Sequence, residues 1–146
     1  MFVMNDLLKY AFRIRAAMNK MQREITIEMQ KQFGGDLTRP QFYLLTLISE
    51  EQPCKITQLA QKLGVRPSTI STMINRLVDG GFVSRVYGQN DRRNVLVSIT
   101  DRGKSVLTKD IENYGKVLEK IIGALEPNEL ETFTKTFEKM VTIQNR

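Results

Sequence analysis

The chain contains no histidine and only one cysteine, Cys54, and these absences exclude most familiar catalytic and metal chemistry. A single cysteine cannot form an internal disulfide, and without histidine the common zinc sites cannot be assembled from one chain. The Ser-His-Asp and Cys-His arrangements are excluded in the same way, which leaves only enzymes that work with carboxylates or lysines. The sequence offers no combination of a nucleophile, a general base and metal ligands from which a catalytic site could be built. We therefore expect a protein that is not an enzyme and that holds neither a metal nor a cofactor.

Long apolar runs are also missing. The N-terminal segment MFVMNDLLKYAFRIRAAM is interrupted by Asn5, Asp6, Lys9, Arg13 and Arg15, so it lacks the apolar core of a signal peptide. No later stretch approaches the roughly 20 apolar residues that span a bilayer. Because a lone cysteine also fits a reducing compartment, we expect a cytoplasmic protein that does not act at a membrane.

Positive charge is concentrated in the middle of the chain. The 146 residues, a length typical of one domain with a substantial core, carry a formal net charge of +6. Residues 55–105 hold nine Lys and Arg against three Asp, whereas the flanking segments are almost neutral. One interpretation is an ordinary solvated face. The sharper one is a polyanion-binding segment between neutral scaffolding.

Both ends of the chain predict amphipathic helices. Apolar residues recur in steps of four and three at Leu7, Ala11, Ile14, Met18, Met21, Ile25 and Met29, and again at Leu107, Ile111, Tyr114, Leu118, Ile121 and Leu125. A break at Pro127 is followed by a last helix with an apolar face. We expect these seams to pack together. They either close a bundle within one chain or, as we prefer, lie partly against a second subunit, because the middle segment is too compact to cover them.

Between these ends the pattern changes to two short helices and a hairpin. ITQLAQKLGV predicts a helix capped by Thr57, and RPSTISTMINRLVDGG predicts a second helix that begins near Pro67 and ends at Gly80. FVSRV and VLVSI follow as two strands, after which Thr100 is placed to cap another helix. Helix, turn, helix and β-hairpin are the parts of a winged helix-turn-helix.

The predicted fold class is therefore mainly α with a small β-hairpin wing. Three segments are expected along the chain. Residues 1–36 form an N-terminal dimerisation helix, residues 37–105 a winged helix-turn-helix DNA-binding domain, and residues 106–146 the C-terminal dimerisation helices. The excess of positive charge coincides with the second of these segments.

The second short helix is the candidate reader of the DNA major groove. Ile70, Ile74, Leu77 and Val78 form its buried stripe, while the opposite face is polar and short-chained, as a helix entering that groove requires. The candidate base-contacting residues are Pro67, Ser68, Thr69, Ser71, Thr72, Asn75 and Arg76. The alternative is an ordinary surface, since Ser and Thr are common near helix starts.

The hairpin loop, YGQNDRRNVLV, concentrates charge in a short connection. Because a narrow minor groove favours an inserted arginine, we expect Arg92 and Arg93 to reach DNA there. Asn90 supplies turn flexibility, and Asp91 is placed to orient a neighbouring arginine. The alternative is a purely structural ion-pair cluster, and both descriptions can hold at once.

Four further residues are candidates for contacts with DNA phosphates: Arg66, Arg85, Lys62 and Thr57. Arg66 is the most telling, because it stands before Pro67, where Ser, Thr or Asp would normally cap the helix. Either Ser68 or a shifted helix start compensates for the missing cap, or Arg66 has another use. We favour a phosphate contact.

From roughly Leu37 to Leu107 the chain resembles the MarR family of bacterial transcription regulators. The resemblance is carried by ITQLAQKLGVRPSTISTMINRLVDGGFVSRV and above all by DRRNVLVSITDRG, which is similar to the family's Asp-x-Arg wing signature. It implies a homodimer with interlocking terminal helices. It also implies that Arg93 is the minor-groove arginine, that Asp91 is the signature acid, and that residues 67–76 read the major groove.

Cys54 departs from one branch of that family. The peroxide-sensing members carry their reactive cysteine in the first helix, where this chain has none. Cys54 lies before the helix-turn-helix, beside Lys55, which leaves a partly activated thiol as one interpretation. We expect instead a small, inert, apolar filler.

These observations predict a sequence-specific transcriptional regulator, acting as a repressor, that binds a pseudo-palindromic operator in double-stranded DNA as a homodimer. The family resemblance adds a small-molecule effector that changes the spacing of the recognition helices and lowers operator affinity. The alternative is a nonspecific architectural DNA-binding protein. A protein-protein adaptor that has kept the fold without DNA binding is a third candidate.

Overall fold

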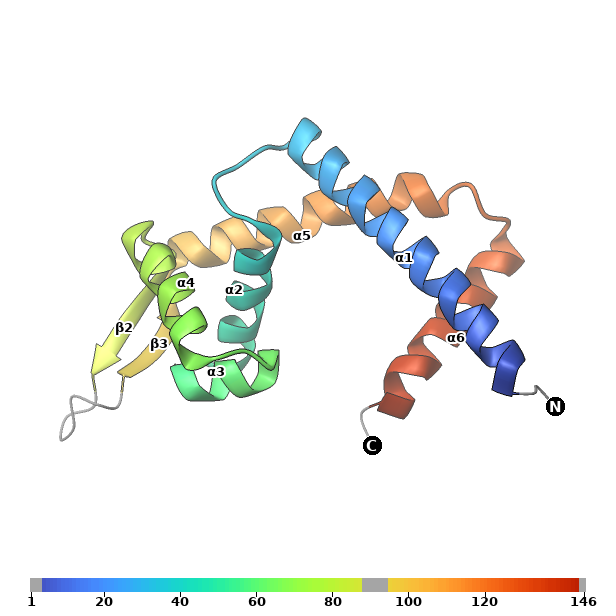
Figure 1. The fold of residues 1–146 in the computed structure, drawn as a ribbon. Coiled ribbons are helices and arrows are strands. Elements are labelled where there is room, and N and C mark those ends of the chain that lie inside the picture. Colours follow the sequence, from blue (N-terminus) through green and yellow to red (C-terminus); the bar gives the residue numbers. More distant parts are fainter. Residues whose placement is uncertain (1–3, 88–94, 145–146) are drawn as a thin grey trace. The chain divides into compact units, whose positions relative to one another are not determined.

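The computed structural model describes residues 4–87 and 95–144, which form six helices and three short strands (Figure 1). The predicted winged helix-turn-helix is present with its hairpin, so the predicted fold class is confirmed. In chain order the elements are α1 (Met4–Gln32), α2 (Arg39–Glu51), β1 (Cys54–Lys55), α3 (Ile56–Leu63), α4 (Pro67–Asp79), β2 (Val83–Tyr87), β3 (Val95–Ile99), α5 (Asp101–Ile122) and α6 (Pro127–Gln144).

The chain divides into two compact units. Residues 30–112 form one, called here the winged-helix unit, and residues 1–29 with 113–146 form the other, called here the helical unit. The long helices α1 and α5 each contribute to both. The predicted division of function among residues 1–36, 37–105 and 106–146 stays a prediction.

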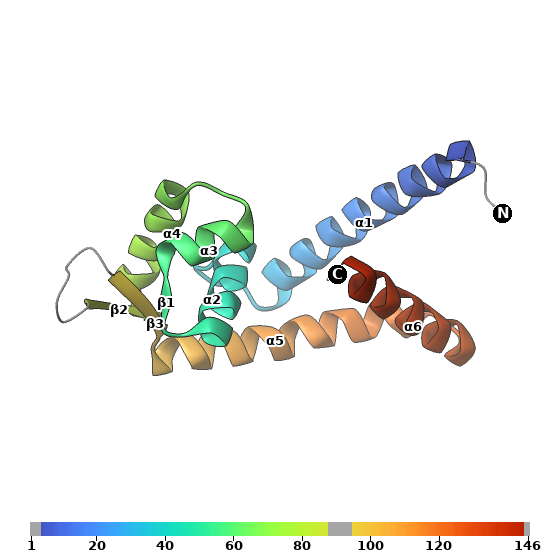
Figure 2. The same cartoon turned by 90° about the horizontal axis from the view of Figure 1, so that it is seen from below.

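The core of the winged-helix unit lies between α2, α3, α4 and the sheet. Figures 1 and 2 show these three helices gathered beside the first half of α5, with β2 and β3 projecting past α4. Leucine and isoleucine side chains from each helix meet with no exposed surface or almost none; the largest are Leu44, Leu45, Ile48, Leu59, Ile70, Ile74 and Leu77. This burial supplies the hydrophobic stabilisation that holds the helix-turn-helix together.

The sheet has three antiparallel strands in the order β1-β3-β2. Val97 in the central strand pairs with Cys54 on one side and with Arg85 on the other. The sequence patterns did not predict β1, because two residues are too few to show the alternation that marks a strand. Because β1 pairs with β3 and leads directly into α3, it connects the start of the helix-turn-helix to the wing.

Side chains cap three of the scaffold helices. Thr38 and Gln41 form a capping box at the start of α2, and the hydroxyl of Thr100 accepts the N–H of Gly103 at the start of α5 (3.1 Å), as predicted for Thr100. The carboxylate of Glu129 accepts the N–H of Glu126 before α6 (3.1 Å). These caps satisfy N–H groups that the first turn of each helix leaves free.

The predicted cap of α3 was wrong. The helix begins at Ile56 with Lys55 at the N-cap, so Thr57 already lies inside its first turn. The reason is that Lys55 also belongs to β1, and the chain turns into the helix directly from that strand. Gln58 assists by accepting the N–H of Lys55 (3.0 Å). At the other end Gly64 adopts φ 64°, a left-handed conformation that glycine reaches without strain, and this makes the helix-turn-helix turn.

The helical unit has a much smaller core. Ile25 and Met29 of α1 are buried with Val117 of α5, and Tyr114, Leu118 and Ile121 pack against them, so the two predicted seams meet here. The rest of the first seam is exposed, as are most apolar side chains of α6. Within residues 4–87 and 95–144, no helix combines the length and the apolar character needed to cross a membrane.

Gly103 sets how closely α5 approaches the turn between α4 and β2. A Cβ atom at this position would lie 2.1 Å from the backbone oxygen of Phe82 and 2.7 Å from a side-chain carbon of Ile99. The neighbouring Thr100 hydroxyl donates to the backbone oxygen of Gly81 (2.6 Å), which fixes the same junction. Only glycine therefore fits where α5 meets the base of the wing.

We predict that Gly103→Ala lowers the free energy of unfolding by about 3 kcal/mol, because the added methyl meets backbone rather than a movable side chain. Gly115→Ala is the matched control in the same helix, since a Cβ atom there would meet nothing within 4 Å. It should raise the free energy of unfolding by about 0.5–1 kcal/mol. Urea denaturation at one fixed protein concentration measures both, and equal stability of the two variants would contradict the close approach.

Candidate nucleic-acid interface

Helix α4 presents two contrasting faces. Ile70, Ile74 and Leu77 are 0% exposed, which fixes the rotation of the helix about its own axis. The predicted polar residues lie away from this stripe. Pro67, Ser68, Thr69, Thr72, Asn75 and Arg76 are exposed, and Ser71 is half-buried. The Thr72 hydroxyl donates to the backbone oxygen of Ser68 (3.1 Å), so it faces an outside partner mainly as an acceptor.

The N-terminus of α4 carries a cation where the scaffold helices carry an acceptor. Arg66 is the N-cap and makes no side-chain cap bond, and Pro67 follows in the first turn. The helix therefore starts where the sequence placed it, with neither a shifted start nor a side-chain cap in compensation. The N-terminal end of a helix attracts anions, and a guanidinium beside it strengthens that attraction.

The predicted phosphate-contacting residues Thr57 and Lys62 both lie exposed on α3. Lys62 forms an ion pair with Glu51, the last residue of α2, and each side chain is 46% exposed. This partner of Lys62 was not predicted, since the two residues belong to different helices and no periodic pattern links them.

Arg85 lies on β2 and is half-buried. Because Arg85, Val97 and Cys54 are paired across the three strands, their side chains project from the same face of the sheet. The remaining wing predictions, Asn90, Asp91, Arg92 and Arg93, lie outside the described residues. The described ends of the hairpin, Tyr87 and Val95, are paired with each other.

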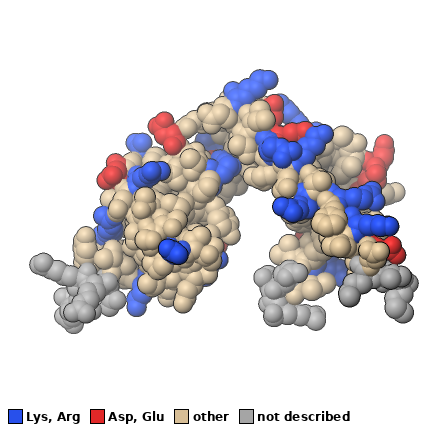
Figure 3. All heavy atoms as spheres, in the orientation of Figure 1, with Lys and Arg blue, Asp and Glu red and all other residues tan. Residues whose placement is uncertain are grey.

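Charge is sparse over the helix-turn-helix. In Figure 3 the surface over α3 and α4 is mostly uncharged, and Lys and Arg side chains stand on it as separate groups. A surface of this kind combines hydrogen-bonding groups with isolated cations, which suits contact with base edges and phosphates together. In the part of the chain that the structure describes, no three carboxylate or thiol groups are gathered closely enough to hold a metal ion.

Cys54 is buried beside this surface. It is 1% exposed, and its thiol donates to the backbone oxygen of Val97 at 3.8 Å. Burial raises the pKa of the thiol, the nearby Glu51 carboxylate raises it further, and Lys62 opposes them. Since the thiolate is the reactive form, these surroundings agree with the expected inert filler.

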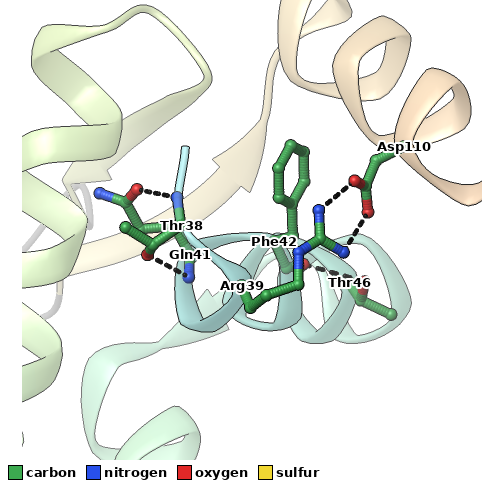
Figure 4. A network of polar contacts seen from close by, with 6 residues as sticks. All are labelled: Thr38, Arg39, Gln41, Phe42, Thr46 and Asp110. Carbon is green, nitrogen blue, oxygen red and sulfur yellow. Dashed lines mark hydrogen bonds and ion pairs between the residues drawn. The ribbon is translucent and has the colours of Figure 1, made fainter. Parts of the chain in front are cut away.

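A second ion pair, also not predicted, ties α2 to α5. The guanidinium of Arg39 meets both carboxylate oxygens of Asp110, one of them at 3.1 Å, and lies 4.6 Å from the centre of the Phe42 ring (Figure 4). Asp110 is 71 residues away in sequence, which is why no local pattern signals the contact. The pair fixes α2, and with it the helix-turn-helix that α2 supports, against α5.

Comparisons with known proteins agree with this geometry. A family model described as the MarR family matches residues 37–95. YpoP of Bacillus subtilis (strain 168), an uncharacterized HTH-type transcriptional regulator, is 27% identical over 129 residues, which are 88% of this chain and 92% of that protein.

Two solved structures share the fold. A MarR family protein from Bacillus stearothermophilus matches with a TM-score of 0.84 at 17% identity, over 100% of both chains. FabT of Streptococcus pneumoniae, solved in complex with DNA, matches with a TM-score of 0.74 at 18% identity, over 95% of this chain and 97% of that one.

Proposed function

The chain belongs to the MarR family of winged helix-turn-helix transcriptional regulators, and from this premise we propose that it binds a pseudo-palindromic operator as a homodimer and represses transcription. One observation carries the proposal. Helix α4 is pinned by a stripe with no exposed surface, and its opposite face offers short hydrogen-bonding side chains to the outside. A reader of the major groove needs this combination of fixed orientation and close approach.

Base contacts are assigned to the exposed face of α4. Ser68, Ser71 and Thr72 are short enough to let the helix backbone approach base edges, and Asn75 and Arg76 are longer. Asn is suited to adenine and Arg to guanine, because each can form two hydrogen bonds with that base. Pro67 and Thr69 lie in the first turn, where recognition helices meet the bases.

Phosphate contacts are assigned to residues around this face. Arg66 adds a cation to the positive end of the α4 dipole, and Thr57, Lys62 and Arg85 are placed on α3 and β2 of the same unit. Such contacts fix the register of a protein on the duplex and make its affinity depend on salt. In the wing, Arg92 and Arg93 are assigned to the minor groove, Asp91 to orienting an arginine, and Asn90 to the turn between the strands.

Dimerisation is assigned to the helical unit. Its α6 has no buried side chain among residues 127–143 and exposes an apolar face that includes Phe133 (52%) and Phe137 (45%), with ring centres 5.7 Å apart. An isolated helix of 18 residues is marginal in water and gains most of its stability from a packed face. The exposed apolar seam of α1 likewise requires a packing partner. A second copy of this chain supplies such a partner for both.

Repression follows from occupancy, because a dimer seated on an operator excludes other proteins from that DNA. The proposed effector acts by binding one arrangement of the two recognition helices better than the other, which shifts the population away from the DNA-binding state. The alternative, an architectural DNA-binding protein, would share the charge but not the base discrimination. A specific reader gains roughly 10³-fold or more over random DNA.

Arg66→Ser should separate stability from function. A serine at the N-cap accepts an N–H of the first turn and should raise the free energy of unfolding by about 1 kcal/mol. Operator affinity should nevertheless fall, and the slope of log affinity against log salt should flatten by about one unit. Lys104→Ser removes the same charge from α5 and serves as the control. Unchanged affinity and slope for Arg66→Ser would reject its phosphate contact.

Substitutions in the wing and in α4 should change DNA binding in different ways. Arg93→Ala should weaken binding several-fold to operator and scrambled duplex alike, with a flatter salt dependence, because it removes a cation. Thr72→Ala should change which base is preferred at one operator position, with a smaller effect on that slope. Fluorescence anisotropy with both duplexes at several salt concentrations measures these effects. Identical behaviour of the two variants would remove the proposed division of labour.

Phe137→Glu should dissociate the dimer, because it places a charge in the apolar face of α6. Lys139→Glu is the control, since it introduces the same side chain two residues on, toward the other side of the helix. Sedimentation velocity should give monomer or aggregate for the first variant and dimer for the second. A soluble dimer of Phe137→Glu would reject α6 as the interface.

A further inference from the structure

Lys62, which the proposed function assigns to a DNA phosphate, forms an ion pair with Glu51 in the free protein. Lys62 lies in the last turn of α3, where a positive charge suits the helix dipole. Glu51 lies at the last position of α2, where a negative charge meets the negative end of that helix dipole and is unfavourable. The last turn of α2 contains no basic residue to offset it. Helix stability therefore does not account for a glutamate at this position.

The pair is also too exposed to be a strong structural tether. Both side chains are 46% exposed, and ion pairs in such surroundings contribute little to folding. Core residues already fix the two helices, since Leu44, Leu45 and Ile48 of α2 and Leu59 of α3 are buried in one cluster. Removing the pair should leave the fold intact.

The position of the pair matters more for the interface. In Figure 1, α3, the N-terminal end of α4 and the ends of β2 and β3 next to residues 88–94 all lie toward the lower side of the winged-helix unit. Glu51 lies three residues before Cys54, the first residue of β1, and Lys62 of α3 is paired with it, which places the pair beside β1 and the first helix of the helix-turn-helix. A phosphate that reaches Lys62 from this side must compete with a carboxylate already bound there.

We propose that Glu51 limits DNA affinity by competing with a backbone phosphate for Lys62. The proposal rests on the proposed function, because it requires DNA at this face. In the free protein the ammonium group is neutralised by Glu51; in the complex it turns to the phosphate and leaves the carboxylate solvated. The exchange weakens a contact that carries no sequence information, and it therefore raises the relative weight of the base contacts made by α4.

The test is a double-mutant cycle on DNA affinity, measured by anisotropy with a labelled operator duplex at several salt concentrations. Glu51→Gln should raise affinity about two- to five-fold, the gain expected when an exposed ion pair no longer competes. It should also steepen the dependence of log affinity on log salt by up to about one unit, because the cation that the DNA releases is no longer offset by a cation attracted to the freed Glu51 carboxylate. Glu50→Gln is the control, since it removes the same charge from the adjacent, exposed position.

In a Lys62→Gln background, Glu51→Gln should have no greater effect than Glu50→Gln. An equal gain in both backgrounds, or a gain from Glu50→Gln as large as that from Glu51→Gln, would overturn the proposal, because either result would indicate general repulsion. Urea midpoints of all variants should agree; a lowered midpoint for Glu51→Gln without a gain in affinity would show a structural tether instead. If the wild-type protein binds no duplex, the proposed function fails first, and the wild-type titration alone shows it.

Discussion

The burial of Ile70, Ile74 and Leu77 determines which side of α4 faces water, and the proposed interface depends on that choice. These side chains have no exposed surface, because α2, α3 and the sheet close over them. Rotating the helix by even one position would expose part of the stripe and bury hydroxyl groups without partners, at a cost in both hydrophobic and hydrogen-bonding free energy. The polar face therefore points outward as a consequence of core packing. Recognition and folding are two results of one pattern.

Helix capping follows the same division between scaffold and interface. The helices that support the fold begin with acceptors, Thr38 at α2 and Thr100 at α5. The two helices of the helix-turn-helix begin instead with Lys55 and Arg66, neither of which can accept a backbone N–H. Some helix stability is thus given up at these two N-termini, and the proposed interface includes the N-terminus of α4. A DNA phosphate at the N-terminus of α4 would satisfy N–H groups there and meet the Arg66 cation.

Much of the fold could be predicted from local pattern. The stripe of α4, the breaks at Pro127 and Gly80, and the cap at Thr100 are each encoded within a few residues, so spacing alone reveals them. What could not be predicted depends on contacts between distant elements. The strand β1 exists because Cys54 pairs with Val97, 43 residues further on, and this strand moves the start of α3 ahead of Thr57.

The candidate site divides in the same way. The exposed residues of α4 and the cation at Arg66 follow from sequence, whereas the pairing of Lys62 with Glu51 and of Arg39 with Asp110 follows only from tertiary structure. A count of charges in the sequence treats every lysine as available for contact with a DNA phosphate. A neighbouring carboxylate changes that, and the sequence pattern does not reveal such neighbours.

The central claim is that this chain reads a DNA sequence as a dimer. Selection of bound fragments from a random duplex pool at near-physiological salt, followed by sequencing, tests it most directly. The expected result is an enriched palindrome whose half-sites are centred about one helical turn apart, matching two recognition helices related by a two-fold axis. Recovery of DNA without an enriched motif, or recovery of no DNA, would contradict it.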